Sequence, residues 1–527
     1  MKQTAPNRPW ASNVTAANGR ETVGIKVASY AIACVLILIC LVGLALYSVE
    51  GLSLFRLGEI GFGDSYILYD VLHFQKTGTI YRDLSQPHYL PAQYSPLVYI
   101  VYSMPGLIVH SRNPFMAPRL MVITAFLLCI GITTSIVRTL IASRYAWVWG
   151  ALLPFSTRSM SAWILQLRGD FPGIALSLLA IRLLLSDVRW AVPLAGICAG
   201  FAMQFKITYI AAAIAGALWL LAQKRWQDFV RFAVSGSLFF VGPYLLYSLR
   251  EPRMFGQMLA LSPGIRNIAG NLELMDKAIV ELLILLALPG LASIQWRTWS
   301  KETLVVLFVA TSFTVAGITD MQAGGNINYY FELFFAVVPI AVLGVFRLME
   351  LAQRSAVLGL ALTSVLVIHS LAPELLTLHG NIGLLRIGWI DSNNAELDHV
   401  EHALAGHRFF SAVPRLALLD PEPPLMEPYL LAYMHRLGKA NLEPIVEPIR
   451  GNEYEVVITN ASPGSWRGIG HLDPTLREAI ASSYRPYCRF GSWLFHLPNH
   501  GQPDGSSLAQ ELRKIGCAAP ASAGSNW

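Results

Sequence analysis

The sequence predicts an α-helical polytopic membrane protein that carries a small α/β domain after its membrane bundle. Of its 527 residues, 54% are hydrophobic and only 14% are charged, whereas soluble globular proteins carry roughly 25% charged residues. The stretch from Ala28 to Val49 contains no charged residue and is long enough to cross the hydrocarbon core as a helix. Similar apolar runs recur as far as about Leu378. We therefore expect about 11–13 spans, several of them shorter than a full crossing.

Four regions follow from where the composition changes. We expect an amino-terminal tail at 1–26, a transmembrane bundle at 27–378 with a polar loop at 50–94, an α/β domain at 379–498 and a flexible tail at 499–527. Short apolar runs bounded by turn residues predict strands in the α/β domain, and amphipathic stretches predict helices between them. The expected strands are Leu416–Leu419, Tyr454–Thr459 and Trp493–Leu497, and the expected helices are Met426–Leu437 and Pro474–Ser483.

The charges around the first apolar run predict its orientation. This run is longer than the apolar core of a signal peptide and more spans follow it, so it is not expected to be cleaved. Four basic residues precede it: Lys2, Arg8, Arg20 and Lys26. Positive charge favours the cytoplasmic side, which places the amino terminus inside and the 50–94 loop and the carboxy-terminal domain outside a plasma (inner) membrane. The net charge of +6 reflects basic turns such as Lys224–Arg225 and does not form a nucleic-acid-binding stripe.

The six cysteines do not form a disulfide framework. Cys34, Cys40, Cys129 and Cys198 lie in apolar runs, where a thiol behaves as a small hydrophobe. Cys488 and Cys517 lie near the carboxy terminus and could pair if that region is extracytoplasmic. No spacing of cysteine or histidine predicts a metal site.

Asp64 is the first candidate catalytic residue, in the loop that follows the first span. It lies in the segment Gly61–Tyr66, where two glycines permit tight turns. A carboxylate near the membrane surface could act as a general base on a hydroxyl. It could equally be the N-cap of a helix at Tyr66–Phe74, and the residue alone does not decide between these roles. Asp70 and Asp83 are expected to be solvated.

The loop then leads into a span at Tyr94-Ser95-Pro96-Leu97. Pro96 suits the first turn of a helix, where no amide donor is needed. Tyr94 could bind substrate or could belong to the belt of aromatic residues at the membrane surface, with Tyr89 and Tyr99.

Two later segments also place polar residues directly before the start of a predicted span. The segment Pro154–Ser159 is followed by Arg168-Gly169-Asp170, and the segment Gly324–Tyr330 reads Gly-Gly-Asn-Ile-Asn-Tyr-Tyr. Together with the order of residues in the first loop, these segments resemble the GT-C glycosyltransferases. That family comprises polytopic enzymes with lipid-linked sugar donors, among them protein O-mannosyltransferases and aminoarabinose transferases. The resemblance covers most of the chain, and each of its motifs is loose.

The resemblance implies a GT-C-like bundle and a polyprenyl-phosphate sugar donor. It gives Asp64 the role of the base and places Asp170 at the second acidic position, which assists acceptor or metal binding in some members. A divalent cation, Mg²⁺ or Mn²⁺, is therefore a candidate cofactor. The aminoarabinose branch has a lysine shortly before the proline that opens the next span, where it meets the donor phosphate. This chain has Gln93-Tyr94-Ser95 before Pro96, so another cation must hold the phosphate.

Three basic residues are candidates for that phosphate, and each has an alternative. Arg168 could bind phosphate through its guanidinium fork, pair with Asp170 or contact a lipid headgroup. Lys206 could bind phosphate, although a lysine at a short turn between spans more often extends its amine toward the membrane surface. Arg266 is a better phosphate candidate than Arg253 in the same loop, but both could simply be solvated.

Asn326, Asn328 and Tyr329 are the candidate sugar-binding residues. The asparagines could bond sugar hydroxyls and the tyrosine could stack on a ring. An N-cap with neighbouring belt aromatics would require the same residue types.

The sequence thus favours an inverting glycosyltransferase that transfers a sugar to an extracytoplasmic acceptor hydroxyl on a glycan, lipid or protein, in cell-envelope biogenesis. One alternative is a transporter or flippase of lipid-linked sugars, which inverted repeats or charge pairs within spans would favour; neither is evident in the sequence. Another alternative is a non-catalytic envelope assembly protein.

Overall fold

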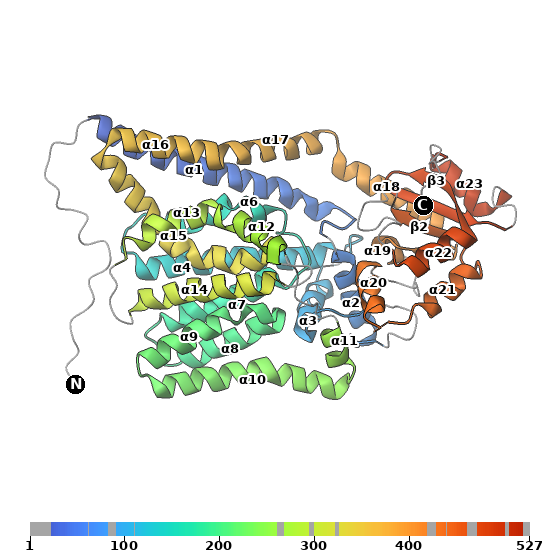
Figure 1. Ribbon diagram of the computed structural model, residues 1–527, viewed down its shortest axis with the longest axis horizontal. Coiled ribbons are helices and arrows are strands. Elements are labelled where there is room, and N and C mark those ends of the chain that lie inside the picture. The colour runs from blue at the N-terminus through green and yellow to red at the C-terminus, as the bar shows by residue number, and fades with distance from the viewer. Residues whose placement is uncertain are drawn as a thin grey trace.

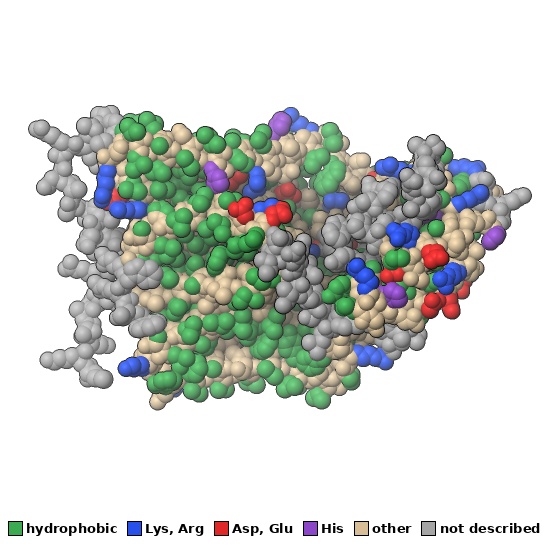
Figure 2. Space-filling model, viewed as in Figure 1, with side chains coloured by type: hydrophobic (Ala, Val, Ile, Leu, Met, Phe, Trp, Pro, Cys, Tyr) green, Lys and Arg blue, Asp and Glu red, His purple; other side chains and the backbone are tan. Residues whose placement is uncertain are grey.

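A computed structural model describes residues 23–61, 63–82, 91–109, 111–260, 268–294, 300–321, 326–418, 428–438, 440–460, 472–500 and 505–519. Figure 1 shows a long bundle of roughly parallel helices with a small mixed α/β domain at one end. Apolar side chains cover much of the bundle in the space-filling view. Charged side chains lie mainly at its ends and on the carboxy-terminal domain, with a small group of acidic and basic side chains midway along this face (Figure 2). This distribution is typical of a membrane bundle that carries a soluble domain.

Six helical stretches in the described residues are long and apolar enough to cross a membrane. They are formed by α1 (Val23–Gly51), α4 (Met116–Leu140), α10 (Trp226–Arg250), α14 (Lys301–Asp320), α15 (Phe331–Arg354), and the joined α16 (Ala356–Leu366), η6 (Val367–Leu371, a π-helix) and α17 (Ala372–Arg386). Shorter helices of the bundle are α3 (Pro96–Ser103), α5 (Ala146–Leu152), α7 (Asp170–Leu184), α8 (Ala191–Phe205), α9 (Ala211–Ala222) and α13 (Leu282–Leu291). The predicted polytopic membrane fold is confirmed, although several predicted spans are short helices packed among the long ones.

Glycines set how closely these helices pack. A methyl group at Gly344 of α15 would overlap the Leu286 carbonyl oxygen of α13, and one at Gly290 would overlap the Ile340 carbonyl oxygen. Helices in a membrane associate mainly through such close backbone approach, because lipid provides no hydrophobic drive between them. The glycines in the apolar runs therefore determine the α13–α15 contact.

The bundle ends in a layer of short helices beside the carboxy-terminal domain, where Figure 1 shows α2, α3 and α11. The remaining helices that precede the carboxy-terminal domain are η1 (Leu52–Phe55), α2 (Asp64–Thr77), η2 (Pro105–Leu107), η3 (Leu153–Ser156), α6 (Arg158–Ser161), η4 (Ile207–Ile210), α11 (Met254–Ala260), α12 (Ile268–Ile279) and η5 (Ile327–Tyr330). Pro96 lies in the first turn of α3, as predicted.

The carboxy-terminal domain is built on a four-stranded sheet of order β1-β2-β4-β3, in which β1 and β2 are parallel and the other pairs antiparallel. Its elements are α18 (Trp389–Leu404), β1 (Phe409–Ser411), α19 (Pro414–Ala417), α20 (Pro428–Arg436), α21 (Glu443–Arg450), β2 (Val456–Asn460), α22 (Pro474–Ser483), β3 (Tyr484–Phe490), β4 (Trp493–Pro498) and α23 (Ser507–Lys514). Strands β2 and β4 and helices α20 and α22 lie where the sequence predicts them.

The carboxy-terminal region differs from the prediction in four places, the first being the strand β1, which was not predicted. Leu416 lies in the helix α19, because Pro414 opens a helical turn and a short apolar run alone does not distinguish strand from helix. Strand β3 is absent from the prediction because its Pro486 and its arginines argue against a strand; it is an edge strand, where proline is tolerated. The tail predicted to be flexible contains the helix α23.

A disulfide joins Cys488 in β3 to Cys517 after α23. The pairing that the sequence left open is therefore present, and it attaches the region of α23 to the sheet.

The carboxy-terminal domain contacts the loop that follows α1. The Leu57 amide donates to Asn394 Oδ1 at 2.8 Å, and Arg415 Nε donates to the Leu57 carbonyl at 3.1 Å. The Arg56 guanidinium lies 4.5 Å from the centre of the Trp389 ring. The soluble domain is thus attached directly to the segment that leads to Asp64.

Candidate functional site

Asp64 is fully buried at the first residue of α2 and bonds to backbone amides from two segments. Its Oδ2 accepts from the amides of Gly61 at 2.9 Å and Ile60 at 3.2 Å, and its Oδ1 accepts from the amide of Leu167 at 3.0 Å. Asp64 therefore connects the first loop to the segment that leads into α7. Burial raises the pKa of its carboxyl, while these amides and the nearby arginines 119 and 168 oppose that rise.

The N-cap interpretation of Asp64 is wrong. The N-cap position of α2 is Gly63, whose φ of +89° suits glycine. Gly61 is required for another reason: a side chain there would overlap the side chain of Gln166. The two glycines of the motif thus allow the Asp64 carboxylate to turn back onto its own loop.

Arg119 supports the same loop from α4. Its guanidinium is fully buried and donates to the carbonyls of Arg56, Gly58 (2.6 Å) and Ser53 (3.4 Å). Asp64 is among the charges that act on it. Arg119 was not recognised from the sequence, although a charge at the edge of an apolar run is the available signal.

Asp170, at the first residue of α7, accepts hydrogen bonds from three side chains. Its Oδ1 accepts from the Tyr209 hydroxyl at 2.5 Å and from Lys206 Nζ at 3.2 Å, and its Oδ2 accepts from Asn328 Nδ2 at 2.9 Å. The side chain is 5% exposed. Both oxygens are therefore engaged, and Asp170 holds together α7, the turn between α8 and η4, and η5.

Lys206 lies at the centre of this group of residues. Its Nζ is 3.8 Å from the centre of the Tyr329 ring, and its side chain is only 17% exposed. The interpretation that Lys206 extends toward the membrane surface is therefore wrong: its backbone is extended at this point and directs the side chain to Asp170. Tyr209, three residues further on, was not identified from the sequence, where a tyrosine next to a short turn reads as an interfacial residue.

Arg168 lies between the two carboxylates in the sequence, and the charges of both act on its guanidinium. Its guanidinium lies 5.0 Å from the centre of the Trp163 ring, and its carbonyl accepts the Tyr102 hydroxyl. The charged or ionisable groups that act on it are Tyr94, Asp170, Asp64 and Tyr329. The segment Leu167–Asp170 thus brings Arg168 and both carboxylates into one site.

The site includes most of the residues that the sequence identified. Tyr94, at the mouth of α3, is within electrostatic reach of Arg168, Lys206 and Tyr329. Asn326 is different: its side chain caps η5 by accepting the Ile327 amide at 2.8 Å. Arg266 lies outside the described residues.

Other residues of the sequence analysis lie outside this site. Arg253 is exposed at the start of α11, and Tyr99 is fully buried, which excludes a role in a surface belt. Asp83 and Tyr89 lie outside the described residues.

The two asparagines of η5 offer a matched pair of substitutions. Asn326→Asp retains an acceptor that is equally good at an N-cap, so we expect a change in unfolding free energy within about 0.5 kcal/mol. Asn328→Asp would place a second carboxylate against Asp170, and we expect a loss of about 3–5 kcal/mol, as for an uncompensated buried charge. Thermal unfolding of both purified variants in one detergent tests this contrast. Equal stabilities would contradict the assigned roles.

Asp70 is buried and paired with Arg82, so the expectation that it is solvated is wrong. The Arg82 guanidinium also lies 4.6 Å from the centre of the Tyr69 ring. Burial raises the pKa of Asp70 to about 7, although Arg82 and Tyr99 oppose that rise. The packing of α2 against this salt bridge therefore depends on pH.

We expect the stability of the protein to fall as the pH rises from about 4, the ordinary value for Asp, to about 7. Within that window the folded protein binds more protons at Asp70 than the unfolded chain does, so the slope of unfolding free energy against pH is negative. Thermal unfolding of the wild type and of Asp70→Asn across pH 4–8 measures this contribution. The variant should show a smaller slope, and identical slopes would exclude Asp70 as the source.

The residues around Asp170 do not fit a divalent cation. The two carboxylate oxygens that would bind it already accept from an ammonium, a hydroxyl and an amide. Within the described part of the chain, no group of three His, Cys, Asp or Glu side chains could hold a metal ion. The Mg²⁺ or Mn²⁺ expectation therefore has no site at Asp170.

A second group of charges lies away from this site. Glu374 is a buried residue of α17, inside one of the long apolar stretches, and Glu281 and Arg158 are the charged groups that act on it. The Glu281 carboxylate accepts the Ser159 amide at 3.4 Å. The group was not evident in the sequence because its members lie far apart along the chain: Ser159 and Glu281 alone are 122 positions apart.

The comparisons with known proteins agree with this architecture. No protein-family model and no curated protein matches the sequence. Among solved structures, ArnT from Cupriavidus metallidurans bound to undecaprenyl phosphate aligns with a TM-score of 0.62 and 12% identity over 90% of this chain and 98% of that one. The same protein in its apo state aligns with a TM-score of 0.58 and 12% identity over 86% and 97% of the two chains. The apo oligosaccharyltransferase from Archaeoglobus fulgidus gives a TM-score of 0.45 and 11% identity over 91% and 77%.

The ArnT alignments show that this chain has the fold of ArnT, which confirms the predicted GT-C-like fold. They cover 90% and 86% of this chain and 98% and 97% of the ArnT chain. At 12% identity they establish the fold and not the substrates.

Proposed function

We propose that this protein is a membrane glycosyltransferase that transfers a sugar from a polyprenyl-phosphate donor to an acceptor hydroxyl outside the membrane, with inversion at the anomeric carbon. The observation that carries the proposal is the group formed by Asp64, Arg168, Asp170 and Lys206. These residues are held together where the bundle meets the soluble domain of a GT-C fold. The similar ArnT structure contains undecaprenyl phosphate, which supports a donor of that chemical class.

Lys206 and Arg168 are the proposed phosphate-binding residues. The Ser95 hydroxyl donates to the Gln204 carbonyl, so the start of α3 lies against the end of α8. Lys206 therefore comes from α8 to the region of Tyr94, near the position where the aminoarabinose branch has its lysine. A lysine on a different helix thus compensates for the missing cation before Pro96.

Asp64 is the proposed base. It takes the proton of the acceptor hydroxyl as that oxygen attacks the anomeric carbon. The bond from the anomeric carbon to the phosphate oxygen breaks, and polyprenyl phosphate leaves with its negative charge balanced by Lys206 and Arg168. General-base assistance contributes about 10²–10⁴-fold, and the alignment of two substrates from different phases contributes at least a similar factor.

Asn328 and Tyr329 position the phosphate-binding residues in this proposal. The Asn328 amide nitrogen is bonded to Asp170, and the Tyr329 ring lies beside Lys206. Both residues therefore act through their neighbours, whereas the sequence analysis gave them direct contacts with sugar.

Two observations support an active site outside a plasma (inner) membrane. The disulfide between Cys488 and Cys517 is typical of an oxidising compartment, and the basic residues before α1 favour the cytoplasmic side for the opposite end. The soluble domain contacts the Asp64 loop, where it would help to bind an extracytoplasmic acceptor.

A transporter of lipid-linked sugars is the second candidate. The buried Glu374, with Glu281 and Arg158 nearby, favours it, because ionisable residues inside spans often belong to transport pathways. The transferase accounts for more of the structure, since Asp64 and Asp170 lie beside a soluble domain that a transporter does not need.

Both candidates are tested with the purified protein in liposomes. Radiolabelled polyprenyl-phosphate sugars from a panel are supplied with an envelope extract as the source of acceptor. We expect label in the extract and release of free polyprenyl phosphate, both lost in Asp64→Asn. Movement of intact donor across the bilayer without release would favour the transporter. Neither transfer nor movement with any donor would favour the assembly protein.

A further inference from the structure

A groove between α4 and α7 lies at the end of the bundle remote from the site. Its volume is about 460 Å³. It is lined by Gly131, Thr134, Ser135, Arg138 and Thr139 of α4 and by Arg182 of α7. The α4 residues follow helical spacing and share one face of that helix. A polar groove on a membrane helix is costly unless something satisfies it.

The groove opens toward lipid. Leu127 and Leu128 continue the same face of α4 toward the middle of the membrane, and they are 55% and 54% exposed. An acyl chain could lie along these leucines while a polar headgroup occupies the groove.

The described residues do not balance the positive charge of the two arginines in this groove. Arg182 Nε donates to the Ser135 hydroxyl at 2.8 Å. In the part of the chain that the structure describes, no carboxylate pairs with Arg138 or Arg182, and no acidic residue lines the groove. At the same end of the bundle, by contrast, Glu350 pairs with both Arg347 and Arg354 of α15. Within the described residues the groove therefore carries positive charge without a carboxylate to balance it.

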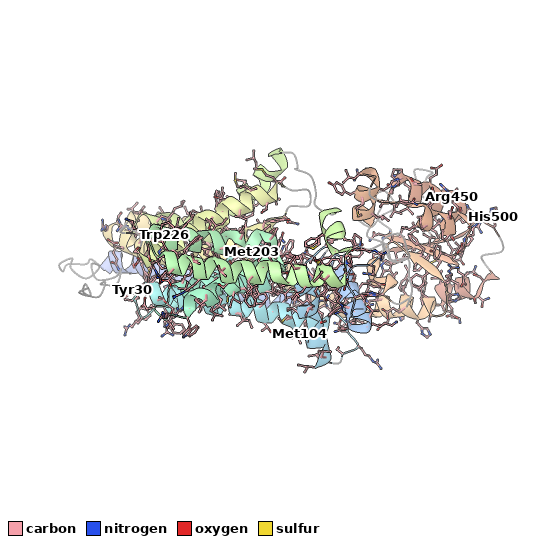
Figure 3. All side chains as sticks on the ribbon, turned by 90° about the horizontal axis from the view of Figure 1, so that it is seen from below. Tyr30, Met104, Met203, Trp226, Arg450 and His500 are labelled. Atoms are coloured by element: carbon pink, nitrogen blue, oxygen red, sulfur yellow. A yellow bond between two sulfur atoms is a disulfide. The ribbon has the colours of Figure 1, made fainter. Side chains whose placement is uncertain are left out.

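The groove lies at the level of the lipid headgroups along the membrane normal. Tyr30 of α1 and Trp226 of α10 lie at the end of the bundle remote from the carboxy-terminal domain (Figure 3), and both are exposed. Exposed aromatic residues of this kind mark the membrane surface. Arg138 and Arg182 lie in the last turns of α4 and α7, which end on that side.

We propose that this groove binds the phosphate of an anionic phospholipid in the leaflet opposite the candidate site. The guanidinium groups of Arg138 and Arg182 donate to the phosphate oxygens, a geometry that suits the arginine fork. The acyl chains lie along the exposed leucines of α4. Because α7 begins at Asp170, the lipid stabilises the α4–α7 pair that supports the site. The inference does not depend on the proposed reaction.

The test compares the wild type with R138Q/R182Q in mild detergent. Native mass spectrometry measures retained phosphatidylglycerol, and thermal unfolding measures the effect of adding phosphatidylglycerol, phosphatidylcholine or inorganic phosphate. We expect the wild type to retain phosphatidylglycerol at least tenfold more than the variant does, and only this lipid to raise the melting temperature. R347Q/R354Q removes two charges that are paired within α15 at the same end and should behave as the wild type.

Three outcomes would overturn the proposal. Equal retention by R138Q/R182Q would exclude the groove as the site. An equal effect of phosphatidylcholine would show that the negative charge is not recognised, and an equal effect of inorganic phosphate would indicate a free-anion site. If the double variant does not fold, R138Q provides the same comparison, because Arg138 is exposed and has no partner in the described residues to lose.

Discussion

Asp170→Asn is expected to destabilise the protein by about 3–5 kcal/mol, because it leaves Lys206 as an unpaired buried charge. The amide of Asn could still accept from Tyr209 or from Asn328, but it cannot neutralise the ammonium. Thermal and denaturant unfolding of the purified variant in detergent measure this loss.

The companion variants separate stability from substrate binding. Lys206→Met also breaks the pair and should be destabilised, whereas the double variant Asp170→Asn/Lys206→Met removes both charges and should recover much of the loss. Binding of undecaprenyl phosphate should follow a different pattern. It should survive in Asp170→Asn, where Lys206 is released from its partner, and should fall at least about tenfold in both variants that lack the lysine, which corresponds to about 1.4 kcal/mol.

This pattern would identify Lys206 as a phosphate-binding residue rather than a purely structural partner of Asp170. If undecaprenyl phosphate binds equally well with and without Lys206, its role is structural only. Additive losses of stability in the double variant would show that the two residues are not coupled.

Much of the architecture could be predicted because it follows from local pattern. The charge-free run at Ala28–Val49 must be buried in a bilayer or in a protein core. The low charged fraction of the whole chain excludes a soluble protein with a core large enough to bury all of its apolar runs. The strands β2 and β4 are apolar and bounded by turn residues. The segment Arg168–Asp170 follows closely after the Pro154–Ser159 segment with which it forms a motif. It could therefore be recognised without knowledge of the fold.

The environment of each polar residue could not be predicted in the same way. Lys206 and Asn328 meet Asp170 only because α7, the α8–η4 turn and η5 converge, and residues so far apart in sequence carry no mutual signal. The predictions for Lys206 and Asp70 were wrong for this reason. A lysine at a turn and an aspartate on an amphipathic helix are usually solvated, and here tertiary packing buries each one beside an opposite charge.

Asp64→Asn is expected to lower the rate of transfer by about 10²–10⁴-fold, the usual contribution of a general base. The Asn side chain can still accept from Ile60 and Gly61, but its NH₂ group would then face the Leu167 amide. An unsatisfied donor costs about 1–3 kcal/mol, so a small loss of stability should accompany the loss of rate. Single-turnover transfer and unfolding of the same preparation measure both effects.

Glu59→Gln is the matched control in the same loop. Glu59 is a buried carboxylate whose Oε1 accepts the Ser65 amide at 2.9 Å. We expect this variant to retain transfer close to the wild-type rate, because the Gln carbonyl can replace that acceptor. If Glu59→Gln and Asp64→Asn lose the same activity, the order of the loop is essential and no base has been identified.

The pH dependence of transfer and the binding of the donor distinguish two roles of Asp64, a general base and a residue that only connects two backbone segments. A base must be ionised, and burial raises the pKa of Asp64 above its ordinary value. Transfer by the wild type and by Glu59→Gln should therefore decline on acidification at a pH above 3.8, the value for an exposed Asp. If Asp64 only connects the Gly61 loop to Leu167, Asp64→Asn should instead lose undecaprenyl phosphate binding and stability together with the rate. If Asp64→Asn retains full donor binding and loses transfer, the base assignment is supported, because a disrupted site could not bind the donor normally.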